Sequence, residues 1–580
     1  MYLELFKNIF TFFKILKIFQ RNFIFLIFLT SITALSEIIL IGSIIPVFGA
    51  LFGNESGNQN FFEKIILNIF PENLISNKLI FFSLIFAIMA LIVGFLRILL
   101  LKFSVFLCAK VSSYSGEVLF KQTLYKPFSF HIESNSSELI SAIIQKNNDI
   151  SASVMSIILL FSNFILFLTI FFFLTFINSK LILIISLVFL LSYLLIELFS
   201  RKRLFANSKL IAKNQNNVIK SLQEGFGGIK EIILQNLQKF YVNLFSKSNL
   251  IIQNKLAENR YISQFPRFII ETLTLLLLAI LIISYERKNL DIIEILPLLT
   301  AIALGVQRLL PIMQQIYFNF VNIVSKQSAL NDYLKIYYTD YQKNYDFEKK
   351  IKIKFSKNII IQNLTFSFEN RNIFKNMSVN IKKGSNVGII GQTGKGKTTF
   401  INLLTGLVKP ENGKILIDDI DLNKNNLQGW TSEITYVPQE IFLFDSTLAE
   451  NIAIGEKIEN IDFDRLIKVC KMAQILEVIN QKKNGLYEIV GEKGIKLSAG
   501  ERQRVGLARA FYKSAEILIL DEATSAIDGA TEKMIMQNIY DFSKNKTLIV
   551  IAHRTNTLSN CDQIFEISNL KLEDVTKNFN

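Results

Sequence analysis

A glycine-rich stretch with the spacing of a phosphate-binding loop follows the apolar run at residues 386–390. Its members are Gly391, Gln392, Thr393, Gly394, Lys395, Gly396, Lys397, Thr398 and Thr399. A buried strand that leads through glycines into a helix directs backbone N–H groups and a helix N-terminus at an anion. In this spacing Lys397 reaches the β- and γ-phosphates of a nucleotide, and the Thr398 hydroxyl can ligate Mg²⁺. The alternative interpretation is a glycine-rich turn that contains a lysine by chance.

Two adjacent carboxylates, Asp521 and Glu522, follow a second apolar run at residues 517–520. The first can help to bind Mg²⁺ through its water shell, and the second can act as general base toward a water that attacks a phosphate. The alternative is that both carboxylates cap the following helix. His553 follows a third apolar run, at residues 547–552. A lone histidine in that position is more often structural than functional.

The composition indicates a membrane protein. The chain has 580 residues, of which 51% are hydrophobic and 52 are Phe, and this is too apolar for a wholly soluble protein of that length. The net charge of +15 is explained by Lys and Arg beside membrane spans, so nucleic acid is not an expected partner. The three cysteines, Cys108, Cys470 and Cys561, have neither metal-site nor disulfide spacing, which suits a reducing compartment.

Six apolar segments are long enough to cross a bilayer. The first three run from about Asn22 to Ala50, from Leu79 to Leu101, and from Val154 to Ile177. The fourth follows a tight connection at residues 178–180 and ends near Phe199. The last two run from Phe265 to Tyr285 and from Ile292 to Tyr317. Positive residues before the first span, and in the long segments 102–153 and 200–264, predict a cytoplasmic N-terminus. Residues 60–70 have the spacing either of a small helix on the outer surface or of a plain loop helix.

The spans and the later β-rich pattern together predict the domain organisation. We predict a transmembrane domain over residues 1–325, with long cytoplasmic helical extensions, and a charged linker over residues 326–355. From residue 356 to residue 580, short β-rich runs alternate with helices, which indicates a soluble α/β domain.

Further motifs lie in a fixed order around the phosphate loop. They are Tyr436-Val437-Pro438-Gln439, Leu497-Ser498-Ala499-Gly500-Glu501, Ile517 to Glu522, Ser525-Ala526-Ile527-Asp528, and Ile551-Ala552-His553-Arg554. With them the chain resembles the ATP-binding cassette (ABC) transporters over essentially its full length, specifically the exporters with six spans and one cassette. The resemblance implies a membrane all-α six-helix domain of the type I exporter fused to an α/β P-loop nucleotide-binding domain. The expected cofactors are ATP and Mg²⁺.

The resemblance also implies roles for single residues. Glu522 would be the general base, His553 would contact the γ-phosphate, and Gln439 would link the metal and the attacking water to the membrane domain. Thr398, Gln439 and Asp521 would serve Mg²⁺. Phe368 would stack on adenine, and Asp528 would belong to the nucleotide site.

The signature loop of such a cassette closes over ATP held by a second cassette. The resemblance therefore implies a homodimer with two equivalent sites, in which Ser498 and Gly500 meet the partner's γ-phosphate. The signature of this chain departs from the commonest Leu-Ser-Gly-Gly-Gln at Ala499 and Glu501. We expect only a modest effect from these two departures.

Charges inside the predicted spans indicate what is moved. Arg97, Arg267 and Arg308 are expected at one depth near the inner leaflet, where two copies would present six guanidiniums to a phosphate or pyrophosphate. Alternatively these arginines snorkel to the interface or pair internally, as Arg267 and Glu271 would at a spacing of four. Glu37 is either a further pore residue or the partner of another helix.

A narrower resemblance connects the stretches around Arg267 and Arg308 with bacterial flippases for lipid-linked oligosaccharides used in protein glycosylation. It implies ATP-driven flipping of a polyprenyl-pyrophosphate glycan across the bacterial inner membrane, with the bilayer and this anionic amphiphile as partners. Two alternatives remain open. The chain would otherwise be a lipid A or multidrug exporter, or a membrane-anchored ATPase regulator that transports nothing.

Overall fold

The computed structural model describes residues 2–51, 78–177, 179–286, 292–338, 353–368, 371–423, 425–552 and 558–578. The chain divides into two compact units, one of residues 1–126 with 131–340 and the other of residues 127–130 with 341–580. The segment 60–70, for which a surface helix was one expectation, lies outside the described residues.

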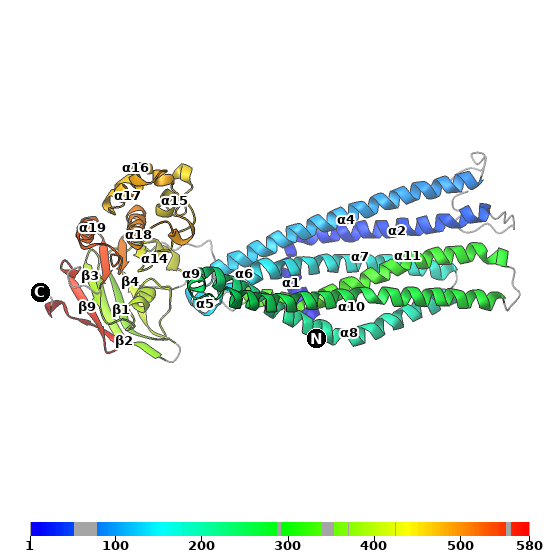
Figure 1. The fold of residues 1–580 in the computed structure, drawn as a ribbon, viewed down its shortest axis with the longest axis horizontal. Helices are drawn as coiled ribbons and strands as arrows, with labels where there is room; N and C mark the ends of the chain where they lie inside the picture. The colour runs from blue at the N-terminus through cyan, green and yellow to red at the C-terminus, as the bar shows by residue number, and fades with distance from the viewer. Residues whose placement is uncertain are drawn as a thin grey trace. The chain divides into compact units, whose positions relative to one another are not determined.

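The first unit is a bundle of long helices that lie side by side (Figure 1). Its helices are α1 (Tyr2–Ile15), α2 (Gln20–Leu51), α4 (Lys78–Leu124), α6 (Ser136–Ser141), α7 (Asn147–Ile177), α8 (Ser179–Gly227), α9 (Ile229–Leu234), α10 (Gln238–Glu286), α11 (Ile292–Ser325) and α12 (Gln327–Tyr338). The short helix α5 (Phe128–Glu133) is divided between the two units, with its first three residues in the second. α2 packs on α4, α7 on α11, and α8 on α10.

Length and hydropathy separate the spanning parts of these helices from their extensions. Among the described residues, three stretches are long and apolar enough to cross a membrane, at Lys17–Ile44, Lys78–Leu124 and Ser136–Phe176. α4 has 47 residues, and a helix of that length rises about 70 Å, more than twice the hydrocarbon thickness of roughly 30 Å. α4 is therefore much longer than the hydrocarbon layer of a bilayer is thick.

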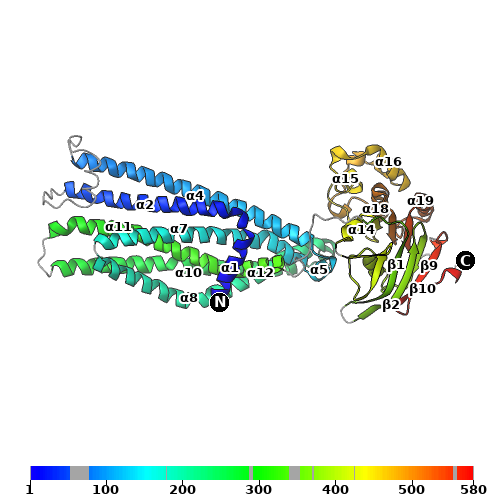
Figure 2. The ribbon, with the colours of Figure 1, turned by 180° about the vertical axis from the view of Figure 1, so that it is seen from behind.

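The first helix, α1, runs across the others instead of along them (Figure 2). Its buried Phe12 packs edge to face on Tyr333 of α12, and the nearby Leu16 belongs to the same apolar cluster as Leu107 of α4. At its other end, the ring of Tyr2 contacts Phe205 of α8. α1 is thus fixed to three other helices by its apolar face, while its charged residues stay exposed.

The second unit is an α/β domain with two sheets. An antiparallel sheet has the order β2 (Arg371–Lys382), β1 (Asn358–Phe368), β4 (Asn412–Ile417) and β5 (Ile420–Asp421). A mainly parallel sheet has the order β10 (Lys571–Asp574), β9 (Gln563–Ser568), β3 (Asn386–Ile390), β8 (Thr547–Ile551), β7 (Ile517–Asp521) and β6 (Ile434–Val437). The helices are α13 (Lys397–Leu404), α14 (Leu427–Ser432), α15 (Leu448–Ile452), α16 (Phe463–Met472), α17 (Leu476–Gln481), α18 (Ala499–Lys513) and α19 (Gly529–Phe542).

One apolar core joins the two sheets of this unit. It contains side chains of β1, β2 and β4 together with those of β3, β7 and β8, and it encloses Trp430 of α14. Trp430 is fully buried, its indole N–H donates to the Leu404 carbonyl at 2.8 Å, and the Phe355 ring lies edge to face on it with centroids 6.1 Å apart. Trp430 is the only tryptophan in the sequence, so its fluorescence reports on this core alone.

We expect Phe355→Ala to destabilise the α/β unit by about 3–5 kcal/mol, because Phe355 is fully buried and its loss leaves a cavity beside Trp430. The midpoint of denaturant unfolding, followed by Trp430 emission on the detergent-solubilised chain, should fall accordingly. Ile420→Ala, at a side chain that is 50% exposed on the same sheet, is the control and should change the midpoint little. Equal midpoints for the two variants would contradict this account of the core.

Candidate nucleotide site

The site lies at one edge of the parallel sheet, where three strands end together. Ile551 of β8 is level with Ile389 of β3 on one side and with Asp521 of β7 on the other. The phosphate loop leaves β3 two residues after Ile389, and Glu522 directly follows β7. Because the carboxyl ends of parallel strands meet at one edge, the glycine loop and the two carboxylates approach each other there.

The loop is shaped by glycines in the left-handed region. Gly394 has φ 79° and Gly396 has φ 107°, conformations that L side chains rarely adopt. A Cβ at Gly396 would also lie 2.6 Å from the side chain of Ile373. α13 begins at the next residue, so that Thr398 and Thr399 are in its first turn. This is the strand, glycine loop and helix that the sequence predicts.

Lys397 is the most buried residue of the loop. Its ammonium donates to the Gly391 carbonyl at 2.7 Å, so the lysine folds back across the loop that it belongs to. Burial lowers the pKa of Lys397 below its usual value, while nearby Glu522 and then Asp521 act in the opposite direction. Both carboxylates therefore act electrostatically on the ammonium at this edge of the sheet.

The two carboxylates differ in their surroundings. Asp521 is buried, and the Tyr436 hydroxyl donates to its Oδ2 at 3.1 Å. Glu522 has φ 52°, an uncommon backbone conformation for a residue other than glycine, and such strain often occurs at functional sites. The Gln439 side-chain amide donates to Glu522 Oε2 at 2.9 Å, which brings the motif after β6 to the same edge.

The residues grouped here fit a Mg²⁺ nucleotide by the chemistry of their donors. Thr398 offers a hydroxyl, Asp521 a carboxylate and Gln439 an amide oxygen, all hard oxygen ligands of the kind that Mg²⁺ prefers. Mg²⁺ usually takes one or two protein ligands and completes its shell with phosphate oxygens and water. A hydroxyl and a carboxylate beside an ammonium are therefore sufficient.

The sequence did not single out Gln503, which connects the parts of this site. It lies in α18 and is 4% exposed. Its side-chain N–H₂ donates to Ser525 Oγ at 3.0 Å and, at longer distances, to the carbonyls of Gln439 and Glu522; its Oε1 accepts from the Ala526 N–H at 2.9 Å. The sequence spacing could have indicated that Gln503 is buried. It precedes the buried residues Gly506 and Leu507 by three and four positions, which places it on the core face of the helix.

The signature residues at the start of α18 are held by local hydrogen bonds. Ser498 caps the helix: its hydroxyl accepts from the Glu501 N–H at 3.3 Å, and the Glu501 carboxylate accepts from the Ser498 N–H at 2.6 Å. This is a capping box, and it gives the departing residue Glu501 a structural role. A Cβ at Gly500 would lie 2.8 Å from the Ala526 carbonyl, so only glycine allows the helix to approach that loop.

The other predicted site residues have varied positions. Phe368 ends β1 with 51% of its surface exposed, so its ring is open to a stacking partner. Asp528 caps α19 by accepting from the Thr531 N–H at 3.0 Å. His553 lies outside the described residues, two positions after β8 ends at Ile551.

The predicted membrane arginines have carboxylate partners where their side chains are described. Arg97 of α4 forms an ion pair with Glu37 of α2, whose side chain is fully buried. Arg267 lies 3.8 Å from Glu271, one turn further along α10, and both side chains are more than half exposed. The backbone of Arg308 is helical within α11, but its side chain lies outside the described part of the structure. Internal pairing, the alternative considered above, is thus present in both described cases.

We expect Gln503→Leu to lower the ATP turnover number by about tenfold or more. The leucine fills the same space but removes the hydrogen bonds to Ser525 and Ala526, so Glu522 is no longer held in position, and each tenfold in rate corresponds to about 1.4 kcal/mol. Nucleotide affinity, measured by equilibrium titration, should change by less than about threefold. Gln537→Leu, on the exposed face of α19, should behave like the unchanged chain. An unaltered turnover number in the Gln503 variant would show that it does not position the site.

Comparison with known families gives two matches that do not overlap. Residues 374–525 match the ABC transporter model, and residues 21–307 match the model of the ABC transporter transmembrane region. Together the two models span both units, from the second helix of the bundle to the motif that contains Ser525.

Comparison with individual proteins gives relatives that match part of the chain. An ATP-dependent lipid A-core flippase of Francisella novicida is 35% identical over 244 residues, which are 42% of this chain and 41% of the relative. A protein of the same name from Blochmanniella pennsylvanica is 39% identical over 213 residues, 36% of each chain. ABC transporter B family member 2 of Dictyostelium discoideum is 39% identical over 36% of this chain and 15% of its own length. The match therefore spans about two fifths or less of each relative.

Comparison with solved structures extends over the whole fold. A bacterial Atm1-family ABC exporter with ATP bound superimposes with a TM-score of 0.76, covering 96% of this chain and 94% of the other at 19% identity. At that identity the likeness concerns the fold, and it confirms the predicted fold class of a helical exporter domain fused to an α/β nucleotide-binding domain. The chain belongs to the ABC transporter family, with its transmembrane region and its ATP-binding region on one polypeptide.

Proposed function

We propose that two copies of this chain form a homodimer that hydrolyses ATP and thereby exports an anionic amphiphile across the bacterial inner membrane. The observation that supports this most directly is the cluster of Lys397, Asp521, Glu522 and Gln439 at one sheet edge. It lies on the same polypeptide as an ABC transporter transmembrane region. The proposed orientation has the N-terminus and the cassette in the cytoplasm, in agreement with the basic residues around the predicted spans.

In this proposal the residues of the site divide the work of phosphoryl transfer. The loop N–H groups and Lys397 hold the β- and γ-phosphates, and Glu522 accepts a proton from the attacking water. Thr398, Asp521 and Gln439 would hold Mg²⁺, which when bound would supply neutralising charge to the phosphates. Gln439 donates to Glu522 Oε2 at 2.9 Å, so the amide fixes the direction in which the base points. His553 has the proposed role of contacting the γ-phosphate.

The position of the signature supports the proposed pairing. Ser498 and Gly500 stand at the start of α18 and are proposed to meet the γ-phosphate held by the second copy. A single chain has one full set of motifs, so a symmetric pair gives two equivalent sites. Closure on ATP and release after hydrolysis would then drive the membrane helices.

For the substrate, we propose first a polyprenyl-pyrophosphate-linked oligosaccharide of the kind used in protein glycosylation. Two of the three arginines adjoin members of one apolar cluster in the sequence, namely Ile270 near Arg267 and Leu309 beside Arg308. Arg97 is connected to the same cluster through its ion-pair partner Glu37, which lies between the cluster members Ala34 and Ile41 on α2. Their proximity to one cluster supports a shared layer. The pairs with Glu37 and Glu271 leave the arginines charged, and a pyrophosphate would compete with those carboxylates for the guanidinium forks.

A lipid A-type substrate is the second candidate, and it is favoured by the names of the two flippase relatives. Its phosphates would recruit the same arginines, but it carries several acyl chains instead of one long isoprenoid. A regulator that transports nothing is the remaining alternative, and it predicts ATP turnover without any movement of lipid.

We expect the purified chain, reconstituted in proteoliposomes, to translocate a polyprenyl-pyrophosphate glycan in the presence of ATP and Mg²⁺. Glu522→Gln removes the proposed base, so it should bind ATP, pair stably and lose translocation by at least about a hundredfold. Lipid A and a panel of amphiphilic drugs are offered to the same vesicles. Movement of lipid A alone would select the second candidate, whereas turnover with no movement of any cargo would select the regulator.

Variants at the ion pair of Arg97 and Glu37 can distinguish a role of Arg97 in substrate binding from a purely structural role. Arg97→Gln alone leaves a buried carboxylate without its cation, which is expected to cost about 3–5 kcal/mol and to lower the yield of folded protein. The double variant Glu37→Gln with Arg97→Gln removes both charges and should restore stability and basal ATPase. If Arg97 binds the pyrophosphate, translocation by the double variant stays at least about tenfold low. Restored translocation would make Arg97 a structural residue.

A control for this experiment uses the partly exposed pair of Lys255 and Glu258, whose charged atoms lie 2.7 Å apart on α10. Neutralising both residues changes the same number of charges away from the proposed substrate layer. This double variant should keep translocation and stability close to those of the unchanged chain.

A further inference from the structure

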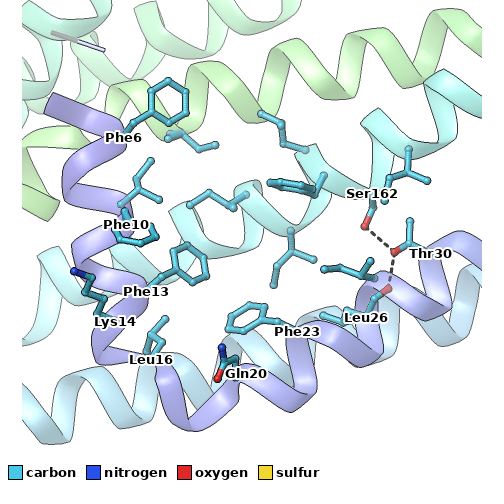
Figure 3. Close-up of a pocket in the computed structure, with 18 of the residues that line it drawn as sticks. Phe6, Phe10, Phe13, Lys14, Leu16, Gln20, Phe23, Leu26, Thr30 and Ser162 are labelled. Carbon is cyan, nitrogen blue, oxygen red and sulfur yellow. Dashed lines mark hydrogen bonds between the residues drawn. The ribbon is translucent and has the colours of Figure 1, made fainter. Parts of the chain in front are cut away.

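A large cavity opens within the first unit between α1, α2, α7 and α11 (Figure 3). Its volume of about 1020 Å³ is at the upper end of the range found for ligand pockets. Rings from two helices form much of its wall, with Phe6, Phe10 and Phe13 on α1 and Phe23 on α2 (Figure 3). Neither the proposed nucleotide chemistry nor the membrane arginines use this cavity.

The end of the cavity next to Thr30 is electrically neutral. Thr30 on α2 and Ser162 on α7 face each other there (Figure 3), with hydroxyl oxygens 3.2 Å apart. The Thr30 hydroxyl donates to the Leu26 carbonyl at 2.7 Å, so the Ser162 hydroxyl donates to Thr30. Both side chains are buried, and their polar atoms are satisfied by each other and by the backbone. This end therefore accepts an apolar chain without a penalty from unpaired groups.

The opposite end is basic. Lys14, Lys17 and Gln20 line the cavity where α1 turns into α2. The Lys14 ammonium lies 5.1 Å from the centre of the Phe10 ring, at the outer edge of α1, and both lysines are exposed. A lysine keeps its charge in water while its stem covers apolar surface, so these side chains can meet an anion at the rim.

The length of the cavity matches one leaflet of a bilayer. The stretch of α2 from Gln20 to Thr30 rises about 15 Å, half of a hydrocarbon thickness of roughly 30 Å. The basic end is then level with lipid headgroups, and the neutral end with the bilayer midplane. We propose that this cavity is a binding site for an anionic phospholipid of the leaflet next to the N-terminus, with an acyl chain between the phenylalanines and the phosphate at Lys14 and Lys17.

Charge favours a lipid over a second copy of the chain as the occupant. Phe6 is 63% and Phe10 66% exposed, so the occupant must cover aromatic surface directly beside two cations. A phospholipid places an anion at that level and an apolar chain below it, whereas a protein surface would have to bring an acidic group to the same point. The site requires no nucleotide and no exported substrate, so its occupancy is independent of the proposed function.

The test measures which lipid the full-length chain retains. The detergent-purified protein, without nucleotide, is incubated with equal amounts of dioleoylphosphatidylglycerol and dioleoylphosphatidylcholine, and bound lipid is counted by native mass spectrometry. We expect a preference of about tenfold for phosphatidylglycerol, the size that contacts with one or two lysines support. In the Lys14→Ala, Lys17→Ala variant the preference should fall below about twofold, and Lys14→Arg, Lys17→Arg should keep it.

A second variant tests the apolar part. Ile27 lines the cavity, so Ile27→Trp should fill it and lower the retention of both lipids, whereas Ile24→Trp on the same helix, outside the lining, should not. Lys7→Ala is the matched control for charge, since Lys7 lies on α1 but not in the lining. A preference that survives loss of Lys14 and Lys17, or full retention in the Ile27 variant, would overturn the proposal. Quantitative cross-linking of the Ile27→Cys variant to a second copy would overturn it as well.

Discussion

The parallel pairing of β3, β8 and β7 is the constraint on which the nucleotide site depends. All five residues of β7 and of β8 are buried, so these strands can exist only inside the core and only as apolar runs. In the observed register Asp521 pairs with Ile551, and a slip of one residue would turn the Asp521 side chain to the other face of the sheet. The position of the charges is thus determined by apolar side chains that never touch a nucleotide.

The same logic explains why much of the site was predictable from the sequence. A strand buried on both faces reads as an uninterrupted apolar run, and the residue that ends the run is marked by its polarity, as Asp521 is. Glycines that must adopt positive φ are likewise visible as residue types, and Gly394 and Gly396 have such φ angles. These features are local in the chain, so no knowledge of the tertiary structure was needed to find them.

The residues that were not predicted act through contacts distant in sequence. Gln503 bonds to segments more than twenty residues away, and a glutamine in a helix normally indicates a solvated face. The partner of Arg97 could not be read from spacing either, because Glu37 lies on another helix and only the packing of α2 on α4 brings them together. A buried carboxylate is costly unless it is paired, so Glu37 needs a cationic partner whatever part Arg97 has in transport.

The proposed nucleotide sandwich has two halves, the phosphate loop and the signature, and polar groups of each half form hydrogen bonds within their own chain. Lys397 donates to the Gly391 carbonyl, and burial disfavours its charged form, so phosphate oxygens would exchange one partner for another and favour the charge. On the signature side, the Ser498 hydroxyl accepts from Glu501 and keeps its own hydrogen for a phosphate. The Glu501 carboxylate adds a negative charge near that phosphate. This carboxylate accepts from the Ser498 N–H, an interaction that agrees with the expectation of a modest effect from the departure at Glu501.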